Sequence, residues 1–429
     1  MRVGLYECDI TPPLGCFLPG HYTDMRAEDV YDMLYAKAVV FENNGKTAAL
    51  VSVDTCEIPN EMHDVVTERI TQYTGIPMEN VCIVSTHSHT GAPVTDDAAI
   101  NCFADNEYKS VFFRRVADAV ILAYKRLREC NIKFVSTDVE NVAFNRNYVL
   151  KDGSLGSFKP VEEIASSLSG TDPSVSALVF EKDGEKLGAL LNFACHQDTV
   201  CPPVPGYSGD YSSEISNILR EEYGNSFVSV FTPGACGDIN HVDYKNPASV
   251  IGKFFIHRRI GKMLANAIIS AMPNAVDVSG ELDVAKEKMM LKKRKLTFEQ
   301  FKDVMGKFLE KDNLVMRIRN LAVYQDCDLP DYTEVCVQAV RIGDFCIYAL
   351  PGEIFVDFGL EIKKRTSYEK CMVIENCNTF CGYIPTEKAF SENSDLYEIS
   401  PCLDSCHMPD SGNKIMEKAL ALGERLNKK

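Results

Sequence analysis

Short runs of Val, Ile, Leu and Ala, bounded by Gly, Pro, Asn and Asp, alternate along the chain with stretches whose apolar residues repeat at helical spacing. The runs predict strands at 35–42, 47–54, 81–84, 175–181, 186–192, 227–231, 335–342, 345–350 and 372–375. The helical spacing predicts helices at 60–75, 107–127, 208–223, 248–271 and 411–426, and a capping box at Thr297-Phe298-Glu299-Gln300 predicts one more. This alternation predicts an α/β fold of mixed β-sheets flanked by α-helices, with no sustained sequence repeat.

The stretch from Val81 to Pro93 places two histidines directly after a predicted strand. The apolar run leads into Thr86-His87-Ser88-His89-Thr90-Gly91, where the Gly and the following Pro indicate a loop. In open α/β sheets, ligands bind beyond the carboxyl ends of the strands. If the strand pleat continues, His87 and His89 project to the same side, so that one binds a metal and the other faces a substrate. Two polar loop histidines are the structural alternative.

Three further predicted strands end in residues that can bind a metal. His196 follows the strand at 186–192, Glu353 the strand at 345–350, and Tyr383 the strand at 372–375. Two imidazoles, a carboxylate and a phenolate suit Zn²⁺, which activates water and polarises carbonyl groups. Ordinary roles stay open at this point, with Glu353 as a helix cap and Tyr383 as a half-buried tyrosine. The residues alone indicate a metal hydrolase as one of two interpretations.

Composition and charge narrow the classes of partner. The 429 residues carry a formal net charge of -16, which disfavours nucleic acid and anionic membrane surfaces as partners. The sequence contains no apolar run of membrane-spanning length and no basic, apolar leader, so we expect a cytoplasmic protein without integral membrane association. The 17 cysteines are scattered through apolar runs, as small buried thiols are.

One group of cysteines has the spacing of a metal site. Cys377 and Cys381 form one pair, and Cys402 and Cys406 form another, with His407 beside it. Spacing of this kind is compatible with a structural zinc site, whereas free thiols are the default interpretation.

Six motifs occur in the order found in the neutral/alkaline non-lysosomal ceramidase family. They are Asp9-Ile10-Thr11-Pro12-Pro13, Thr86-His87-Ser88-His89-Thr90-Gly91, Asn192-Phe193-Ala194-Cys195-His196, Ser208-Gly209-Asp210-Tyr211, Gly234-Ala235-Cys236-Gly237-Asp238 and Gly382-Tyr383-Ile384-Pro385-Thr386. The chain resembles the N-terminal catalytic domain of that family from end to end. We therefore expect a single domain over 1–429, without the signal peptide and the C-terminal β-sandwich domain of secreted members.

The resemblance implies a function for individual residues. By it, the zinc ligands are His87, His196, Glu353 and Tyr383, and His89 acts beside a metal-activated water. Arg146, by the same resemblance, assists as an electrophilic or positioning group. Independently of the resemblance, we expect Tyr397 as the alternative to Arg146 in stabilising the oxyanion, and Asp54, Asp210, Asp238 and Asn240 as substrate-binding residues. Asn240 stands where some members have a serine, which disfavours a serine nucleophile in this chain.

The leading hypothesis is a zinc-dependent hydrolase that cleaves a linear amide, with a small-molecule amide or a lipid-like compound as the substrate. Two alternatives remain at this stage. One is a catalytically silent homologue that binds a cation or an amine in its acidic pocket. The other is a metal-dependent phosphohydrolase or esterase that uses Asp54, Asp210 and Asp238 as the oxygen ligands of a two-metal site. The sequence indicates no oligomeric state.

Overall fold

The computed structural model contains three large sheets of the same design. It describes residues 1–21, 23–97, 102–200, 204–246, 255–297, 299–300, 302, 330–400 and 405–428. In each of the three, the chain forms one strand and then an antiparallel hairpin that pairs with it. A helix follows, then a strand that pairs in parallel with the second strand of the hairpin, and then a second helix. The hydrogen-bonded strand orders are β5-β4-β3-β1, β15-β13-β12-β7 and β22-β20-β19-β18. The chain therefore contains one structural unit three times, although its sequence shows no repeat.

The bounds of the three units follow the same succession. The first comprises β1 (Arg2–Asp9), β3 (Tyr35–Asn43), β4 (Lys46–Val53), α1 (Asn60–Thr74), β5 (Val81–Ser85) and α2 (Asn106–Lys125). The second comprises β7 (Asn131–Asp138), β12 (Ser174–Lys182), β13 (Glu185–Phe193), α3 (Asp210–Tyr223), β15 (Val228–Pro233) and α4 (Ile256–Ala271). The third comprises β18 (Leu282–Lys292), β19 (Tyr332–Ile342), β20 (Phe345–Ala349), α7 (Val356–Arg365), β22 (Lys370–Ile374) and α8 (Ser411–Asn427). Two short edge strands, β6 (Arg128–Glu129) and β17 (Val276–Val278), extend the first two sheets.

Local turn chemistry explains the hairpins. Asn44 and Gly45 join β3 to β4 with φ of 51° and 78°, and Asp183 and Gly184 join β12 to β13 with φ of 50° and 84°. Two successive positive φ angles make the tight turn that matches the twist of paired strands, and Asn, Asp and Gly tolerate them best. Gly75 ends α1 in the same left-handed region, at a φ of 75°.

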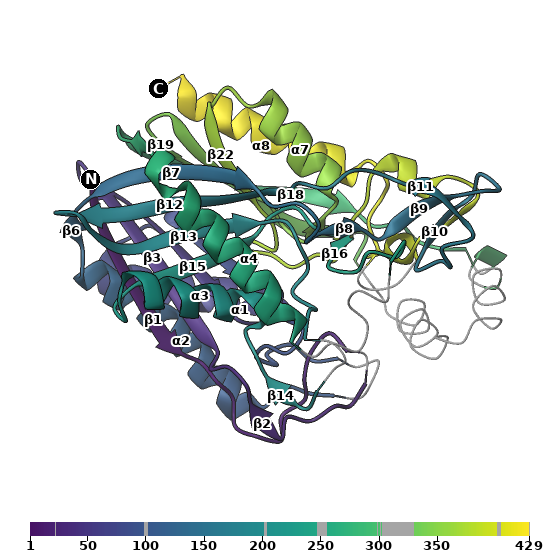
Figure 1. Cartoon of the computed structure of the whole chain (residues 1–429), viewed down its shortest axis with the longest axis horizontal. Helices are drawn as coiled ribbons and strands as arrows, with labels where there is room; N and C mark the ends of the chain where they lie inside the picture. Colours follow the sequence, from purple (N-terminus) through teal and green to yellow (C-terminus); the bar gives the residue numbers. More distant parts are fainter. Residues whose placement is uncertain are drawn as a thin grey trace.

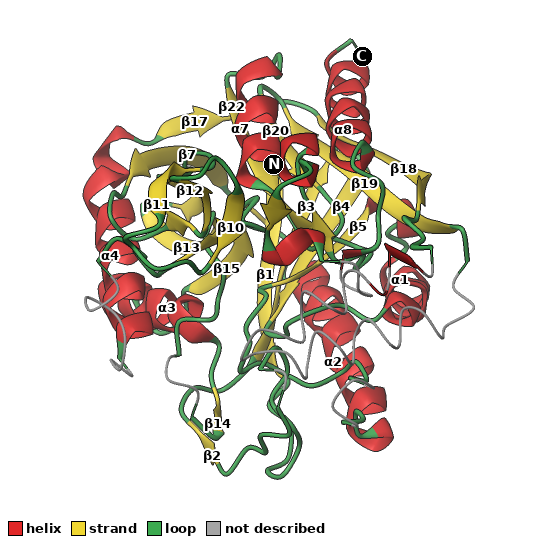
Figure 2. Cartoon of the chain, turned by 90° about the vertical axis from the view of Figure 1, so that its right-hand side faces the viewer, coloured by secondary structure: helices red, strands yellow, loops and turns green. Residues whose placement is uncertain are grey.

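The helices cover the outer faces of the sheets, and the inner faces meet in one central core. Figure 2 shows the pairs α1 and α2, α3 and α4, and α7 and α8 at three separate places around the strands. Phe41, Phe180 and Phe345 come from the three different sheets and lie in the same buried cluster. The rings of Phe41 and Phe180 are 5.8 Å apart. Because aromatic side chains bury large apolar areas, this cluster stabilises the mutual orientation of the sheets.

Shorter strands lie outside the three large sheets. A small sheet joins β9 (Asn147–Leu150), β10 (Leu155–Ser157), β11 (Ile164–Ser167) and β24 (Ser394–Asp395). Three two-stranded pairs join β8 (Phe144–Asn145) to β16 (Ile239–Asn240), β21 (Glu353–Ile354) to β23 (Tyr383–Ile384), and β2 (Asp29–Val30) to β14 (Gly206–Tyr207). In Figure 1, β8 to β11 and β16 are at the right, and β2 and β14 are at the bottom.

The predicted α/β fold with mixed sheets and flanking helices is confirmed. The sequence did not predict β18 or the small sheet, and it indicated α7 only through the alternative role of Glu353 as a helix cap. The capping box forms, because the Gln300 amide donates to Thr297 Oγ1 and the Thr297 amide donates to Gln300 Oε1. Most of the helix predicted after the capping box lies outside the described residues, and so do residues 248–254 of the helix predicted at 248–271. Within the described ranges, no helix is long and apolar enough to cross a lipid bilayer.

Candidate metal centre

Two histidines and one carboxylate converge beyond the strand ends of the three large sheets. His87 Nε2 lies 3.2 Å and His196 Nε2 lies 3.1 Å from Glu353 Oε2, and the three residues are buried. A zinc ion bound at about 2 Å to nitrogen and oxygen in a tetrahedron needs ligand atoms about 3.3 Å apart. Both the kinds of donor atom and their separations therefore fit zinc.

Each ligand comes from a different sheet, and a neighbouring strand end holds it in place. His87 follows β5, and its Nδ1 donates to the carbonyl of Cys56, which follows β4, at 2.8 Å. His196 follows β13, and its Nδ1 donates to the carbonyl of Cys236, which follows β15, at 2.7 Å. A neutral imidazole that donates from Nδ1 keeps the lone pair of Nε2 free for a metal.

The third ligand has a comparable arrangement. Glu353 follows β20, and Glu375, which follows β22 in the same sheet, accepts from the Ile354 amide at 2.7 Å and from the Cys236 amide at 3.0 Å. One buried carboxylate therefore ties the Glu353 segment to the Cys236 segment. Because backbone contacts of this kind fix the direction of a side chain, the geometry of the centre does not depend on a bound ion alone.

The expectation that the strand pleat continues through His87 is wrong. The strand β5 ends at Ser85, and His87 has a φ of 64°, in the left-handed region. The two histidine rings meet nevertheless, with a centroid distance of 5.1 Å and His87 Nε2 at 3.4 Å from His89 Nε2. Left-handed backbone costs free energy in a residue with a Cβ, and outside tight turns it clusters at functional sites. A sharp turn, and not a strand, brings His87 and His89 together.

The charges at the centre also favour a bound cation. Burial opposes a charge on His87, but Cys56 and Glu353 outweigh it and raise the pKa of His87 well above its usual value. Burial likewise opposes the charge on Glu353, but His87 and His196 lower the pKa of this carboxyl. Burial and the neighbouring His87 lower the pKa of His89. The buried Glu353 carboxylate thus requires a positive partner, which a proton or a metal ion can supply.

Tyr383 lies beside Glu353 because the two residues are direct neighbours in adjacent parallel strands. The pair β21 and β23 sets Glu353 opposite Tyr383. The ring of Tyr383 is buried and stacks on that of His196, with a centroid distance of 6.5 Å and an interplanar angle of 10°. The structure therefore brings all four predicted ligands together.

Arg146 adjoins this group and is held by a residue that the sequence did not single out. Its Nε donates to Glu398 Oε1 at 2.7 Å and its guanidinium donates to the Gly237 carbonyl at 2.8 Å. Its Cζ lies 5.6 Å from the ring centroids of both Tyr383 and Tyr397. The predicted catalytic residues Arg146 and Tyr397 therefore lie next to the predicted ligand Tyr383. In the sequence, the only indication of a role for Glu398 is its position directly after Tyr397.

The four predicted substrate-binding residues already have protein partners. Asp54 Oδ2 accepts from the Tyr35 amide at 2.8 Å, and burial raises its pKa to about 6. Asp210 accepts from the amides of Thr199, Val200 and Tyr211. Asp238 accepts from Asn145 and from the Val356 amide, and burial raises its pKa to about 7. Asn240 Oδ1 accepts from the Val242 amide at 3.0 Å. These contacts favour structural roles, and substrate binding by the four stays a prediction.

Further residues beside the centre were missed by the sequence analysis. Cys56 and Glu57 are partly exposed next to His87, and burial raises the pKa of Glu57 to about 7. Asp198 Oδ1 pairs with His241 Nδ1 at 3.0 Å. Gly20, with a φ of 78°, packs so closely on His89 that an added Cβ would lie 2.6 Å from Cγ of that ring. A glycine in a loop gives no such signal in the sequence.

The cysteines with metal-site spacing form no group of three converging ligand atoms in the part of the chain that the structure describes. Burial and the nearby Cys406 raise the pKa of Cys381, and Cys406 Sγ lies 3.8 Å from His407 Nδ1. Cys377 Sγ, in contrast, donates to the Glu375 carbonyl at 3.3 Å. The candidate metal-binding groups among the described residues are His87, His196 and Glu353, and Cys56, His87 and His89. Cys402 lies outside the described residues.

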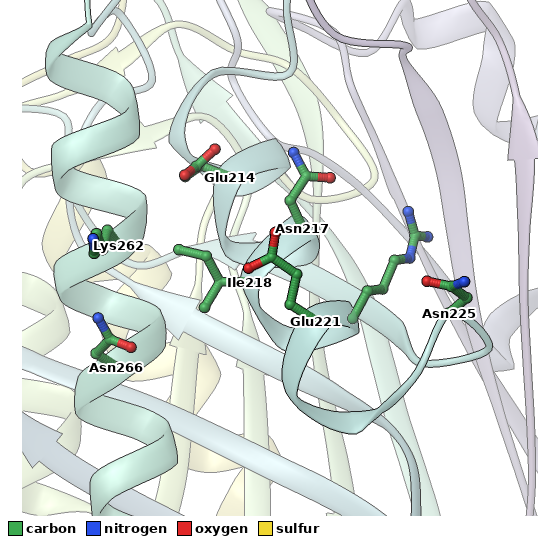
Figure 3. Close-up of a pocket in the computed structure, with 8 residues that line it drawn as sticks. Glu214, Asn217, Ile218, Glu221, Asn225, Lys262 and Asn266 are labelled. Carbon is green, nitrogen blue, oxygen red and sulfur yellow. The ribbon is translucent and has the colours of Figure 1, made fainter.

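A polar surface pocket of about 560 Å³ lies elsewhere, between α3 and α4 (Figure 3). It is lined by Glu214, Asn217, Ile218, Arg220, Glu221, Asn225, Lys262 and Asn266. Arg220 in its wall is already paired with Glu7. None of the predicted site residues lines this pocket.

The fold has counterparts among solved structures. The neutral ceramidase from Pseudomonas aeruginosa matches with a TM-score of 0.78 at 18% identity, over 100% of this chain and 74% of that one. A structure described as "Ceramidase complexed with C2" matches with a TM-score of 0.76 at 17% identity, over 100% of this chain and 75% of that one. Identities this low establish the shared fold. No curated protein sequence matches the chain.

The sequence itself matches a family model. The model describes the N-terminal part of the neutral/alkaline non-lysosomal ceramidases, and the match covers residues 1–240, more than half of the chain. The matched part includes His87, His89, Arg146 and His196, and the same fold continues through Glu353 and Tyr383. The chain therefore belongs to the neutral/alkaline non-lysosomal ceramidase family.

Proposed function

We propose that this protein is a metal-dependent hydrolase of linear acyl amides, with zinc held by His87, His196, Glu353 and Tyr383. The observation that carries the proposal is the convergence of His87 Nε2 and His196 Nε2 on Glu353 Oε2, at 3.2 Å and 3.1 Å. Two solved structures of the same fold are described as ceramidases, which hydrolyse an acyl amide, and this supports the choice of reaction. A zinc ion in such a site supplies Lewis acidity for a carbonyl group and a nucleophile from water at neutral pH.

His89 is the proposed proton carrier. Its Nε2 lies 3.4 Å from that of His87, so the ring reaches the proposed metal centre. Hydrolysis of an amide needs a group that takes a proton from water and gives one to the leaving amine, and an imidazole can do both. The close approach of Gly20 to the other side of this ring restricts the ring to one place.

Arg146 and Tyr397 are the proposed stabilisers of the charge that develops on the carbonyl oxygen. Arg146 is buried, and Glu398 and the Gly237 carbonyl hold its guanidinium in one orientation. A fixed positive charge in a site shielded from water stabilises a developing negative charge without reorganisation. Tyr397 adds a hydroxyl group, on a ring 5.6 Å from that of Tyr383.

Metal content and turnover test this function together. We expect about one zinc per chain by elemental mass spectrometry in protein purified without added metal, and release of a carboxylic acid from an N-acyl amide. In the variant His196→Ala both should be lost, because one ligand of a buried site is missing. The control His63→Gln changes a histidine in α1, outside the centre, and should keep both.

The other outcomes separate the competing functions. Zinc without turnover of any amide or ester would indicate a binding homologue. Activity on phosphate esters that requires magnesium or manganese would indicate a phosphohydrolase. Zinc that persists at full stoichiometry in His196→Ala would place the ion elsewhere and contradict the proposal.

A further inference from the structure

Phe158 combines two unfavourable properties. It follows β10 with a φ of 55°, in the left-handed region, and its side chain is 44% exposed. Left-handed backbone is costly for a residue with a bulky side chain, and partial exposure reduces the hydrophobic gain that offsets this cost. Strained backbone of this kind clusters at functional sites, so the position of this ring points to a function.

The ring of Phe158 lies against the proposed catalytic groups. Its centroid is 5.9 Å from that of Tyr397, 5.6 Å from that of Tyr244, and 5.9 Å from Cζ of Arg146. Tyr397 in turn contacts the proposed zinc ligand Tyr383. The exposed face of Phe158 is therefore an apolar surface that begins next to the group proposed to stabilise the oxyanion.

The residues on both sides of Phe158 are tied to the segment that carries Tyr397. Ser157 Oγ accepts from the Tyr397 amide at 2.9 Å, and Lys159 Nζ pairs with Asp395 Oδ2 at 2.9 Å. These two contacts hold the backbone in its unusual conformation. The ring and Tyr397 are consequently positioned as one unit.

We propose that Phe158 is a specificity-determining residue that packs against an apolar chain of the substrate, next to the amide that is cleaved. The inference rests on the proposed amide hydrolysis and assigns the contact with the apolar chain to one residue of this protein, Phe158. An aromatic face gains free energy when it covers an apolar chain, because both surfaces leave water. A small polar amide would leave this ring in water, and the strained backbone would serve no purpose.

Two other roles for the ring predict different results. If the ring stabilised the fold, its removal would lower the melting temperature. If the ring only positioned Arg146, its removal would lower kcat equally for all substrates. A contact with the substrate chain instead affects long chains and spares short ones.

The test compares kcat/KM for acetyl and dodecanoyl amides of one amine, and for acetyl amides of a short and a long alkylamine. In Phe158→Asn we expect a loss of about tenfold for the long chain in at least one series and less than twofold for the short chains. The melting temperature should stay equal or rise, because Asn tolerates left-handed backbone better than Phe. Phe158→Tyr keeps the aromatic ring, so this variant should show the same preference for long chains as the wild type.

The control is Phe255→Asn, which removes an exposed ring that lies 5.1 Å from the guanidinium of Arg258 in another part of the molecule. It should leave the preference for long chains unchanged. An equal loss for short and long chains, no loss at all, or a lower melting temperature in Phe158→Asn would overturn the inference. If wild-type protein cleaves no amide, the proposed function itself fails and the inference fails with it.

Discussion

Single residues in this protein owe their positions to backbone conformations that few residue types adopt. His87 and Phe158 have left-handed backbone although each has a Cβ, and Gly20 has it beside the ring of His89. At Gly20 the missing side chain is a requirement of space as well as of conformation, since an added Cβ would collide with His89. The turn that directs His87 and the packing that restricts His89 thus each depend on the conformation or the residue type at a single position.

Substitution of Gly20 separates these two requirements. Gly20→Ala should lower the free energy of unfolding by about 1 kcal/mol, because of its positive φ, and lower kcat by about a hundredfold, because His89 is displaced. Gly15→Ala is the matched control: its φ is 88°, and nothing lies within 4 Å of an added Cβ. Gly15→Ala should lose similar stability and keep its kcat, as measured by denaturant unfolding and steady-state kinetics. Equal kcat values for the two variants would show that Gly20 does not position His89.

At the scale of elements, buried contacts between segments distant in sequence hold the site. The pair of Arg146 and Glu398 joins the start of the small sheet to the segment of Tyr397, and both side chains are almost completely buried. The pair of Arg365 and Glu417 joins α7 to α8 at the surface, with both side chains well exposed. Removal of one member of a buried pair leaves an uncompensated charge, whereas an exposed pair contributes little.

We expect substitutions in these two pairs to lower the free energy of unfolding by very different amounts. Glu398→Gln should lower the free energy of unfolding by about 3 kcal/mol, and Glu417→Gln by less than about 0.5 kcal/mol, in denaturant titrations. Glu398→Gln should also lower kcat, because it releases Arg146 from its orientation. A loss as small as that of Glu417→Gln would mean that Arg146 is held by other contacts.

His407 makes the connection between β18 and α8 sensitive to pH. It forms a backbone bridge with Lys293, and burial together with Lys293 lowers its pKa from 6.5 to about 4. The unfolded state therefore binds more protons than the folded state between these values. The contribution of His407 to the free energy of unfolding is fully present above pH 6.5. It is lost as the pH falls toward 4, by about 3 kcal/mol in total.

Thermal unfolding between pH 7 and pH 4 checks this contribution. In His407→Gln the melting temperature should fall less steeply with decreasing pH than in the wild type, because the titrating group is absent. The comparison of slopes, and not of absolute stability, isolates the proton linkage from the change in packing. Identical slopes would show that His407 titrates normally in the folded protein.

At the scale of the whole molecule, the proposed metal centre lies where three sheets meet. His87, His196 and Glu353 each follow a strand of a different sheet, and the same three sheets share the core that contains Phe41, Phe180 and Phe345. An ion bound to all three ligands therefore connects the three units directly. Binding to the folded state alone stabilises a protein by mass action.

Removal of the metal should accordingly destabilise the whole chain. If zinc is present at about a thousand times its Kd, binding adds about 4 kcal/mol, which corresponds to a change of about 4 °C in Tm for a chain of this length. A chelator should therefore lower the Tm of the wild type by about this amount and leave that of His196→Ala unchanged. A chelator effect of equal size in both proteins would indicate a metal outside this centre.

Local sequence patterns predicted the bounds of the hairpin strands better than they predicted which side of a helix is buried. The hairpins with Asn44-Gly45 and Asp183-Gly184 lie within one or two residues of their predicted bounds, because turn chemistry depends on adjacent residues. Val65 and Val111 belong to the apolar patterns of the helices predicted at 60–75 and 107–127, but their side chains are 53% and 52% exposed. Each helix packs on one side only, and its exact rotation depends on the sheet beneath it.

The sequence by itself determined the α/β fold class, the hairpins and the placement of His87, His196 and Glu353 directly after strands, because turns and periodicity depend on residues close together in the chain. Only the tertiary structure decided that three units of one design repeat, that their strand ends meet at one centre, and that Arg146 pairs with Glu398. These features depend on the packing of three sheets around a shared core and on contacts across hundreds of residues. Apolar packing of this kind is non-directional, so no local pattern specifies which strand ends it brings together.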